Sequence, residues 1–425
     1  MSVRRNAVIN VVGNVLPGLI GLVLLPQLIS RLGLELFGVF SLVITIIGYS
    51  SIFDFGVSRA ITLAISVAKS DDHGRERAMV AQAGIVITLG MGIIGALLLL
   101  LLSVPIAHLM SVKEGGLRPA VAAIRFCALA LPVTTVTMCV RGVMEGYENF
   151  LASNLLKALQ GIGAFTLPLI FVLAFGSTVQ AATLGLVVNR FLFLPLHFFL
   201  AKKTGIGLWR NSLEFVARIK ELTVTGGWMT VSNVISPILA TSDRFFISSM
   251  LGSMYVSIYT VPLDAMQRFL LVPAAISNAL FPRLSKQYSD RSGRLNIALA
   301  HMVNMACLSV PLLVALLFGK EVLSLWISED FAVKASTVLK IISVGIFLNG
   351  VANIPFAQLQ AAGKSNQTAM LHILECLVYI PALIALVKLL GVQGAAIAWT
   401  LRCGLDCVIL LYRSRVIEQH RDAHA

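Results

Sequence analysis

Two polar residues, Asn189 and Arg190, stand inside the otherwise apolar run GLVVNRFLFLPL (185–196). A charged side chain at the bilayer centre costs roughly 2.5–3.5 kcal/mol on insertion scales. Arg190 lies about 16 Å from either end of the run 179–201, too far to reach water easily through lipid. We therefore expect it to face another helix or a water-filled cavity. A guanidinium in such a cavity is suited to bind an anion, and phosphate best matches its forked donors.

Charged residues within the apolar runs are unevenly distributed along the chain. The first half carries five cations against one acid, whereas the second half carries four of each. The first half therefore has an excess of positive charge that it cannot pair internally. Arg141 and Lys157 belong to this excess, but they lie near helix ends, where long side chains can extend to the membrane interface.

The acids of the second half suggest a different chemistry. Arg402 and Asp406 are spaced to pair on one helix face, which favours a structural role. Glu375 has no cation three or four residues away. Asp243 and Glu375 could therefore bind a coupling proton or Na⁺, with Thr400 as an additional oxygen ligand. A satisfied interhelical hydrogen bond or ion pair is the alternative interpretation.

The elements that must position these residues are transmembrane helices. Of the 425 residues, 57% are hydrophobic and only 12% are charged, whereas soluble domains are about 25% charged. Apolar runs of 18 or more residues recur along the chain, which predicts an all-α polytopic membrane protein. We expect about 12 spans, near 8–30, 37–67, 80–110, 120–142, 151–175, 179–201, 224–251, 255–281, 297–319, 333–357, 367–389 and 392–413.

The charges between these spans predict an orientation. One set of alternate loops and termini holds 18 Lys and Arg residues, and the other set holds 6. By the positive-inside rule, both termini lie in the cytoplasm. The basic pI of about 9.7 then reflects membrane orientation and requires no nucleic-acid partner.

The spans divide into two predicted lobes. We expect an N-terminal six-helix lobe at 1–201, a cytoplasmic amphipathic linker at 202–223 and a C-terminal six-helix lobe at 224–425. Segments 13–33 and 232–252 align without gaps, which indicates parallel repeats with substrate bound between them. Chance similarity between apolar helices is the alternative explanation.

Signals for enzymatic chemistry are poor. AAGKSN (361–366) ends like a phosphate-binding loop, but Gln358 occupies the required earlier glycine position. The six Cys and seven His residues show no metal-binding spacing. A glycan polymerase or ligase would need a long extracytoplasmic loop, and none is predicted. We therefore expect a protein that is not an enzyme and that holds no metal or other cofactor.

Four segments resemble polysaccharide flippases of the O-antigen (Wzx) type, within the multidrug, oligosaccharidyl-lipid and polysaccharide (MOP) exporter superfamily. They are RNAVINVVGNVLPGLIGLVLLPQLISRLGLELFGVFSL (5–42), FDFGVSRAIT (53–62), RGVMEGYENFLASNLLKAL (141–159) and NALFPRLSKQYSD (278–290). The resemblance covers essentially the whole chain. It implies a V-shaped, MATE-like pair of six-helix lobes around a central cavity.

The resemblance also implies a function. Such proteins move an undecaprenyl-diphosphate-linked glycan across the bacterial inner membrane, among membrane lipids and alongside other membrane proteins of polysaccharide assembly. The substrate site implied here is a cationic cavity, and its candidate residues are Arg59, Arg125, Arg190, Arg402, Asn189 and Asp54. Related peptidoglycan-precursor flippases bind Na⁺, and Asp243, Glu375 and Thr400 are the plausible counterparts. A cation-coupled multidrug exporter of the same superfamily is the alternative function.

Overall fold

The protein consists of helices and short turns in every part that the structure, a computed structural model, describes: residues 3–54, 56–67, 75–110, 116–202, 219, 222, 241–277, 291–362 and 364–422. No β-strand occurs among these residues. The predicted all-α fold class is therefore confirmed.

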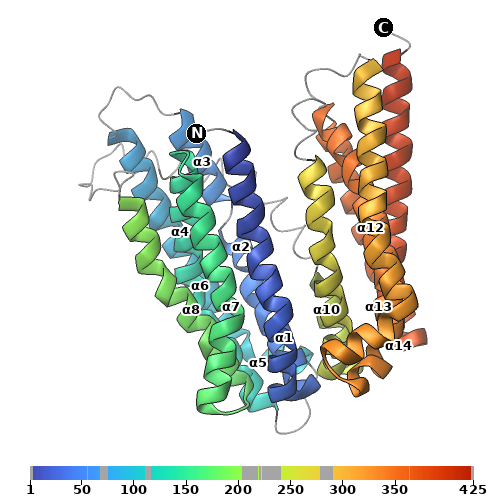
Figure 1. Ribbon diagram of the computed structural model, residues 1–425. Helices are drawn as coiled ribbons and strands as arrows, with labels where there is room; N and C mark the ends of the chain where they lie inside the picture. The colour runs from blue at the N-terminus through green and yellow to red at the C-terminus, as the bar shows by residue number, and fades with distance from the viewer. Residues whose placement is uncertain are drawn as a thin grey trace. The chain divides into compact units, whose positions relative to one another are not determined.

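The chain forms two compact units, Met1–Met254 and Tyr255–Ala425. Figure 1 labels most of their helices. The first unit contains α1 (Val3–Gly48), α2 (Ser50–Phe53), α3 (Val57–Val67), α4 (Arg75–Leu101), α5 (Ser103–Leu109), α6 (Leu117–Gly146), α7 (Phe150–Phe175), α8 (Val179–Ala201) and a helical segment at 241–251. The second contains most of α10 (Ser253–Gln267), then η2 (Arg268–Leu270), a helical segment at 271–277, α12 (Arg291–Trp326), α13 (Glu329–Ala361) and α14 (Ser365–Asp422).

Two predicted spans are interrupted in the structure. The span predicted at 37–67 is broken between α1 and α3, because the carboxylate of Asp54 accepts hydrogen bonds from the Ser58 amide (3.3 Å) and the Ser58 hydroxyl (2.5 Å). These bonds cap the start of α3, and Gly56 adopts the positive φ of 68° that the turn requires. The span predicted at 80–110 is broken at Leu102, which separates α4 from α5.

Glycines also divide the two longest helices. α1 contains Gly33 with φ 74°, and α14 contains Gly391 with φ 61° and ψ −141°. The apolar part of α14, Met370–Val416, is 47 residues long, enough for two membrane crossings of about 20 residues each. Gly391 lies where the eleventh and twelfth predicted spans meet.

The described helices expose apolar surface. Eight of them are long and apolar enough to cross a membrane, and large side chains such as Leu101, Leu325 and Leu389 are more than three-quarters exposed. A face of this kind is suited to hydrocarbon, because lipid tails solvate it without penalty. The chain is therefore a multi-pass membrane protein.

The division between the units differs in position from the predicted lobe boundary. The helical segment 241–251 belongs to the first unit, where Arg244 Nη1 donates to Thr45 Oγ1 (3.3 Å) and Ser248 Oγ donates to the Met110 carbonyl (2.6 Å). Nearly all of the predicted amphipathic linker at 202–223, and the start of the following span, lie outside the described residues. The lobes at 1–201 and 224–425 stay a prediction.

Candidate functional site

Three helices of the first unit, α6, α7 and α8, pack against one another and position the central candidate residues (Figure 1). α7 begins after Asn149, whose side chain accepts from the Ala152 amide, and α8 begins after Thr178, whose hydroxyl accepts from the Ala181 amide. These N-caps satisfy amides that the first helical turn leaves free. Gly185 lets α8 approach the backbone of α7, because a Cβ there would lie 2.7 Å from backbone atoms of Leu167.

Arg190 lies at the midpoint of α8 and is partly buried. Its Nε is buried and has no hydrogen-bond partner among the described residues. The charged group that acts on its guanidinium is that of Arg141, another cation. Arg190 therefore lies beside like charge, and the described structure supplies no acid to neutralise it.

Arg141, on α6, pairs with an acid of the same helix. Its Nη2 is 3.6 Å from Glu145 Oε1, which also accepts a hydrogen bond from Ser153 Oγ at 2.7 Å. The Nε of Arg141 is buried and lacks a hydrogen-bond partner in the described part of the chain. Lys157, on α7, is close enough for its charge to interact with both Arg141 and Glu145.

We call Arg141, Glu145, Lys157 and Arg190 the cationic cluster. It combines three cations with one carboxylate, so its formal charge is +2. Two guanidinium Nε–H donors within it, on Arg141 and Arg190, have no acceptor among the described residues. Unsatisfied buried donors together with excess positive charge are suited to bind an anion with several oxygen acceptors, such as a phosphate.

His197 adds a neutral polar atom near the cluster. Its side chain is fully buried, and both Arg141 and Arg190 act on it electrostatically. Nδ1 lies 2.7 Å from the Phe193 carbonyl, so it must be the protonated nitrogen. In the neutral ring Nε2 is then an acceptor, and no described residue donates to it. Nε2 is therefore suited to accept from a hydroxyl group.

Asn189 joins α8 to α7. Its Nδ2 donates to the Gln160 carbonyl at 2.9 Å, and its buried Oδ1 has no hydrogen-bond partner among the described residues. Gly163 makes room for it, because a Cβ at that position would lie 2.1 Å from Asn189 Oδ1. Asn189 thus sets the contact between the helices that carry Lys157 and Arg190.

The structure does not bring the other predicted site residues of the first unit to this cluster. Arg59 is exposed on α3, and its described electrostatic partner is Asp54, which caps that helix.

Arg125 lies about 24 Å along α6 from Arg141. There, with Arg118, it lines a separate cavity of about 440 Å³, and its Nε donates to Ser103 Oγ at 3.4 Å.

Asp243 is also placed within the first unit. It is fully buried, and its Oδ1 accepts from the Arg244 amide at 2.8 Å. Next to it, Thr241 Oγ1 donates to the Tyr49 hydroxyl at 2.9 Å, and the Tyr49 ring stacks on Phe245. Asp243 therefore belongs to a polar contact between α1 and the segment 241–251.

The remaining candidates lie on α14, in the second unit. The Arg402 guanidinium is 5.2 Å from the ring centroid of Tyr379. Thr400 Oγ1 donates to the Ile341 carbonyl at 2.9 Å, which joins α14 to α13.

Glu375 contacts a histidine of the same helix, because its Oε2 lies 3.4 Å from His372 Nδ1. Within this unit, Glu375 is grouped with His372 and Asp406.

Comparison with known proteins identifies the family. The sequence model described as "Polysaccharide biosynthesis protein" matches residues 3–288, about two-thirds of the chain. A candidate O-antigen transporter of Shigella flexneri is 31% identical over 413 residues, covering 96% of this chain and 97% of the relative. The chain belongs to the polysaccharide biosynthesis protein family.

This polysaccharide biosynthesis family member is also similar to a further sequence relative, to a second sequence model and to a solved structure. AglR of Haloferax volcanii, a candidate flippase, is 23% identical over 93% of this chain and 80% of its own length. A second sequence model, described as MatE, matches residues 229–384. A solved inward-facing multidrug-resistance MATE transporter of the MOP superfamily has a TM-score of 0.73 at 16% identity, covering 99% of this chain and 96% of its own. That likeness establishes a shared fold.

The cationic cluster lies wholly inside the region that matches the polysaccharide biosynthesis family. Three of its members, Arg141, Glu145 and Lys157, come from the segment RGVMEGYENFLASNLLKAL, which also carries the family resemblance. The positions of Arg141 and Lys157 near helix ends predict side chains that extend to the membrane interface. The short turn at 147–149 is the sequence signal that could have included both residues in the predicted substrate site, because it places the end of α6 beside the start of α7.

Proposed function

We propose that this polysaccharide biosynthesis family member is a flippase that moves an undecaprenyl-diphosphate-linked oligosaccharide repeat unit from the inner to the outer leaflet of the bacterial inner membrane. The family match and the names of its relatives support the class of function. The flippase performs no covalent chemistry. It alternates between two access states and provides a polar path for the glycan while the prenyl chain stays in lipid.

The cationic cluster is the observation that carries this proposal. A diphosphate presents several negatively charged oxygens, and Arg141 and Arg190 present buried Nε–H donors that lack acceptors in the described chain. Charge-assisted hydrogen bonds of this kind are worth about 1.5–3 kcal/mol each. With both termini in the cytoplasm, as the loop charges predict, Arg141 and Lys157 lie toward the cytoplasmic entrance and Arg190 near mid-depth.

Transport is proposed to be driven by an ion gradient, H⁺ or Na⁺, without a bound cofactor. The repeat unit reaches the flippase on its lipid carrier, so membrane enzymes that build the unit and those that polymerise it are the partners that this chemistry requires. The described residues that carry the substrate site are Arg141, Lys157 and Arg190, with Asn189 and His197 as supporting polar groups.

The direct test is flipping of a lipid-diphosphate oligosaccharide in proteoliposomes. Arg190→Glu lowers the formal charge of the cluster from +2 to 0, so we expect at least about a tenfold loss of rate. Arg190→Lys keeps the charge and should retain part of the activity. Lys388→Glu is the matched control, because it makes the same change of charge at an exposed position in the second unit. If the Arg190→Glu variant flips the lipid at the wild-type rate, the proposed site is refuted.

Multidrug export is the second candidate function, favoured by the MatE match over residues 229–384. Cationic drugs would be repelled by a cluster of charge +2. We therefore expect expression of this chain to give cells no protection against cationic dyes. Protection that is lost in Glu375→Gln and retained in Arg190→Glu would support the drug exporter over the flippase.

A further inference from the structure

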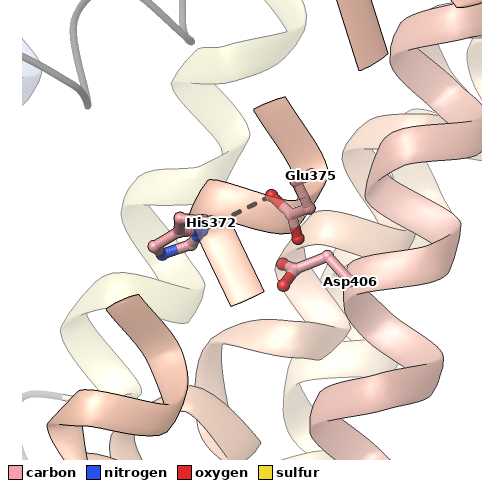
Figure 2. A group of neighbouring side chains, drawn as sticks. All are labelled: His372, Glu375 and Asp406. Carbon is pink, nitrogen blue, oxygen red and sulfur yellow. Dashed lines mark hydrogen bonds and ion pairs between the residues drawn. The ribbon is translucent and has the colours of Figure 1, made fainter. Parts of the chain in front are cut away.

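The second unit contains a cluster of titratable side chains that brings together distant parts of α14 (Figure 2). His372 and Glu375 precede Gly391, and Asp406 follows it. In one straight helix, Glu375 and Asp406 would lie about 46 Å apart. Instead, the ligand atoms of all three side chains lie within 4.8 Å of one another. Gly391, in a conformation that favours glycine, is where the helix reverses to allow this.

The two carboxyl groups of this cluster are incompletely paired. The Glu375 side chain is only 9% exposed, and its Oε2 lies 3.4 Å from His372 Nδ1. Glu375 Oε1 and Asp406 Oδ1 are both buried, and no described residue donates a hydrogen bond to either. In Figure 2 the two carboxyl groups face each other. Two ionised carboxylates in this position repel, so the pair calls for an added positive charge.

The surrounding charges fix how much positive charge is needed. Arg402, on the same helix, acts on both Asp406 and His372. With a neutral imidazole, Glu375, Asp406 and Arg402 sum to a formal charge of −1. The thiols of Cys403 and Cys407 also interact with Asp406, and a thiol carries no formal charge. One added monovalent cation therefore neutralises the cluster.

The neighbouring helix α13 leaves that balance unchanged. The Phe356 ring lies 6.1 Å from the His372 ring, and Asn349 Nδ2 lies 3.9 Å from Cys403 Sγ. Neither of these α13 side chains titrates. The charged and titratable groups that the described structure places around the pair are therefore those of α14 itself.

We propose that His372, Glu375 and Asp406 form a proton-binding site, in which Glu375 and Asp406 share one proton and His372 exchanges it with the surroundings. An alkali cation favours several oxygen ligands, whereas this site offers an imidazole nitrogen as its third ligand atom. A divalent metal would add two charges beside Arg402. A proton supplies the single charge required, and imidazole is the side chain best suited to pass it on.

The exchange step is balanced within the triad. The protonated carboxyl group loses its proton to His372 Nδ1, which leaves the Glu375–Asp406 pair doubly ionised and the ring an imidazolium. The imidazolium then releases the proton of Nε2, and the ring returns to neutrality. If the chain is a flippase, as proposed above, this site links the proton gradient to transport; the proton site itself stands independently of that function.

Infrared difference spectroscopy on the purified full-length protein tests the site without transport. At neutral pH, the wild type should show the C=O stretch of a buried protonated carboxyl group. Glu375→Gln and Asp406→Asn should each abolish it, and either variant alone suffices if the other does not fold. Asp330→Asn is the matched control, because Asp330 is an exposed acid of α13 paired with Lys334 at 2.8 Å. An unchanged band in both site variants would overturn the proposal.

Added ions distinguish a proton from a metal. Neither NaCl nor ZnCl₂ should remove the protonated-carboxyl band from the wild type, and loss of the band on addition of either ion would show that the site takes that metal instead. Flipping assays under an imposed pH gradient then test the link to transport. We expect the gradient to accelerate wild-type flipping and not that of Glu375→Gln. If the pH gradient does not accelerate wild-type flipping although the band is intact, the proposed coupling is overturned. The proposed proton site and the proposed flippase function would then both still stand.

Discussion

Buried nitrogen atoms without partners are the most informative single atoms of the first unit. An unsatisfied buried donor costs about 1–3 kcal/mol, so a protein seldom retains two side by side without use. The Nε atoms of Arg141 and Arg190 are two such donors among the described residues, on helices that pack together and close enough for the two charges to interact. A bound phosphate oxygen would satisfy them, which is why the cluster supports an anionic substrate more strongly than a count of arginines does.

Arg141 provides the first prediction at this scale. Arg141→Gln lowers the formal charge of the cluster from +2 to +1 and removes one guanidinium donor. We expect the affinity for inorganic pyrophosphate, measured by calorimetry on the purified protein, to fall by at least about tenfold. Lys334→Gln should bind like the wild type, because Lys334 is exposed and pairs with Asp330 in the second unit. Equal affinities for Arg141→Gln and the wild type would exclude Arg141 from the anion site.

Gly163 gives a second prediction, which concerns packing. Gly163→Ala would place a Cβ 2.1 Å from Asn189 Oδ1, so α7 and α8 must separate or Asn189 must move. Overpacking of this kind costs about 1–3 kcal/mol, and it should also slow flipping by displacing Arg190. Thermal unfolding in detergent measures the first effect.

Gly90→Ala is the control for that experiment. Gly90 is exposed on α4, and a Cβ added there would meet no atom within 4 Å, so alanine should be tolerated. If both alanine variants unfold at the wild-type temperature, the contact between Gly163 and Asn189 does not constrain the packing of α7 on α8.

At the scale of elements, the turn within α14 determines the proposed proton site. Gly391 has φ 61° and ψ −141°, a region that side-chain-bearing residues rarely occupy. We expect Gly391→Ala to cost about 1–3 kcal/mol of stability and to weaken the protonated-carboxyl band, since Asp406 would lose its position beside Glu375. Thermal unfolding and infrared spectroscopy measure the two effects together.

Gly404→Ala is the matched control on the same half of α14. A Cβ at Gly404 would lie 3.6 Å from Leu348 Cδ1, an ordinary contact, and the position is helical. It should keep both the stability and the band. If Gly391→Ala does the same, the turn is not what holds the triad together.

Individual helices are predictable from the sequence because apolar length and end signals are local. The spans predicted at 151–175 and 179–201 coincide with α7 (Phe150–Phe175) and α8 (Val179–Ala201). Breaks inside long apolar runs were not predicted, since the capping of α3 by Asp54 depends on one side chain in a single turn. The length of an apolar run does not predict such a turn.

The candidate site was only partly predictable. The mid-helix position of Arg190 and its need for a neighbour follow from the sequence. Its proximity to Arg141 depends on how α6 packs against α8, which no local spacing encodes. The spacing of Arg402 and Asp406 predicts a pair on one helix face, and the structure shows that the charge of Arg402 acts on Asp406. The same spacing carries no information about Glu375 and His372 across the turn.

At the scale of the whole molecule, loop charge predicts the orientation in the membrane. The turn at 147–149 should face the cytoplasm and the turn at 176–178 the opposite side. We expect a membrane-impermeant maleimide to label Ser177→Cys in intact cells and Glu148→Cys only in inverted membrane vesicles. The unsubstituted chain is the background control, because all six of its cysteines lie within helices. The reverse labelling pattern would invert the predicted topology.

Arg190 also has a consequence for how the chain is made. α8 emerges from the ribosome after α6 and α7, and only residues 176–178 separate it from α7. An isolated helix with a central arginine enters lipid at a penalty of roughly 2.5–3.5 kcal/mol. Insertion of α8 should therefore depend on α6 and α7 still being next to the translocon, where Asn189 can bond to α7 as the helix enters. Deletion of α7 should leave α8 outside the bilayer, and biogenesis, not only transport, then depends on this helix contact.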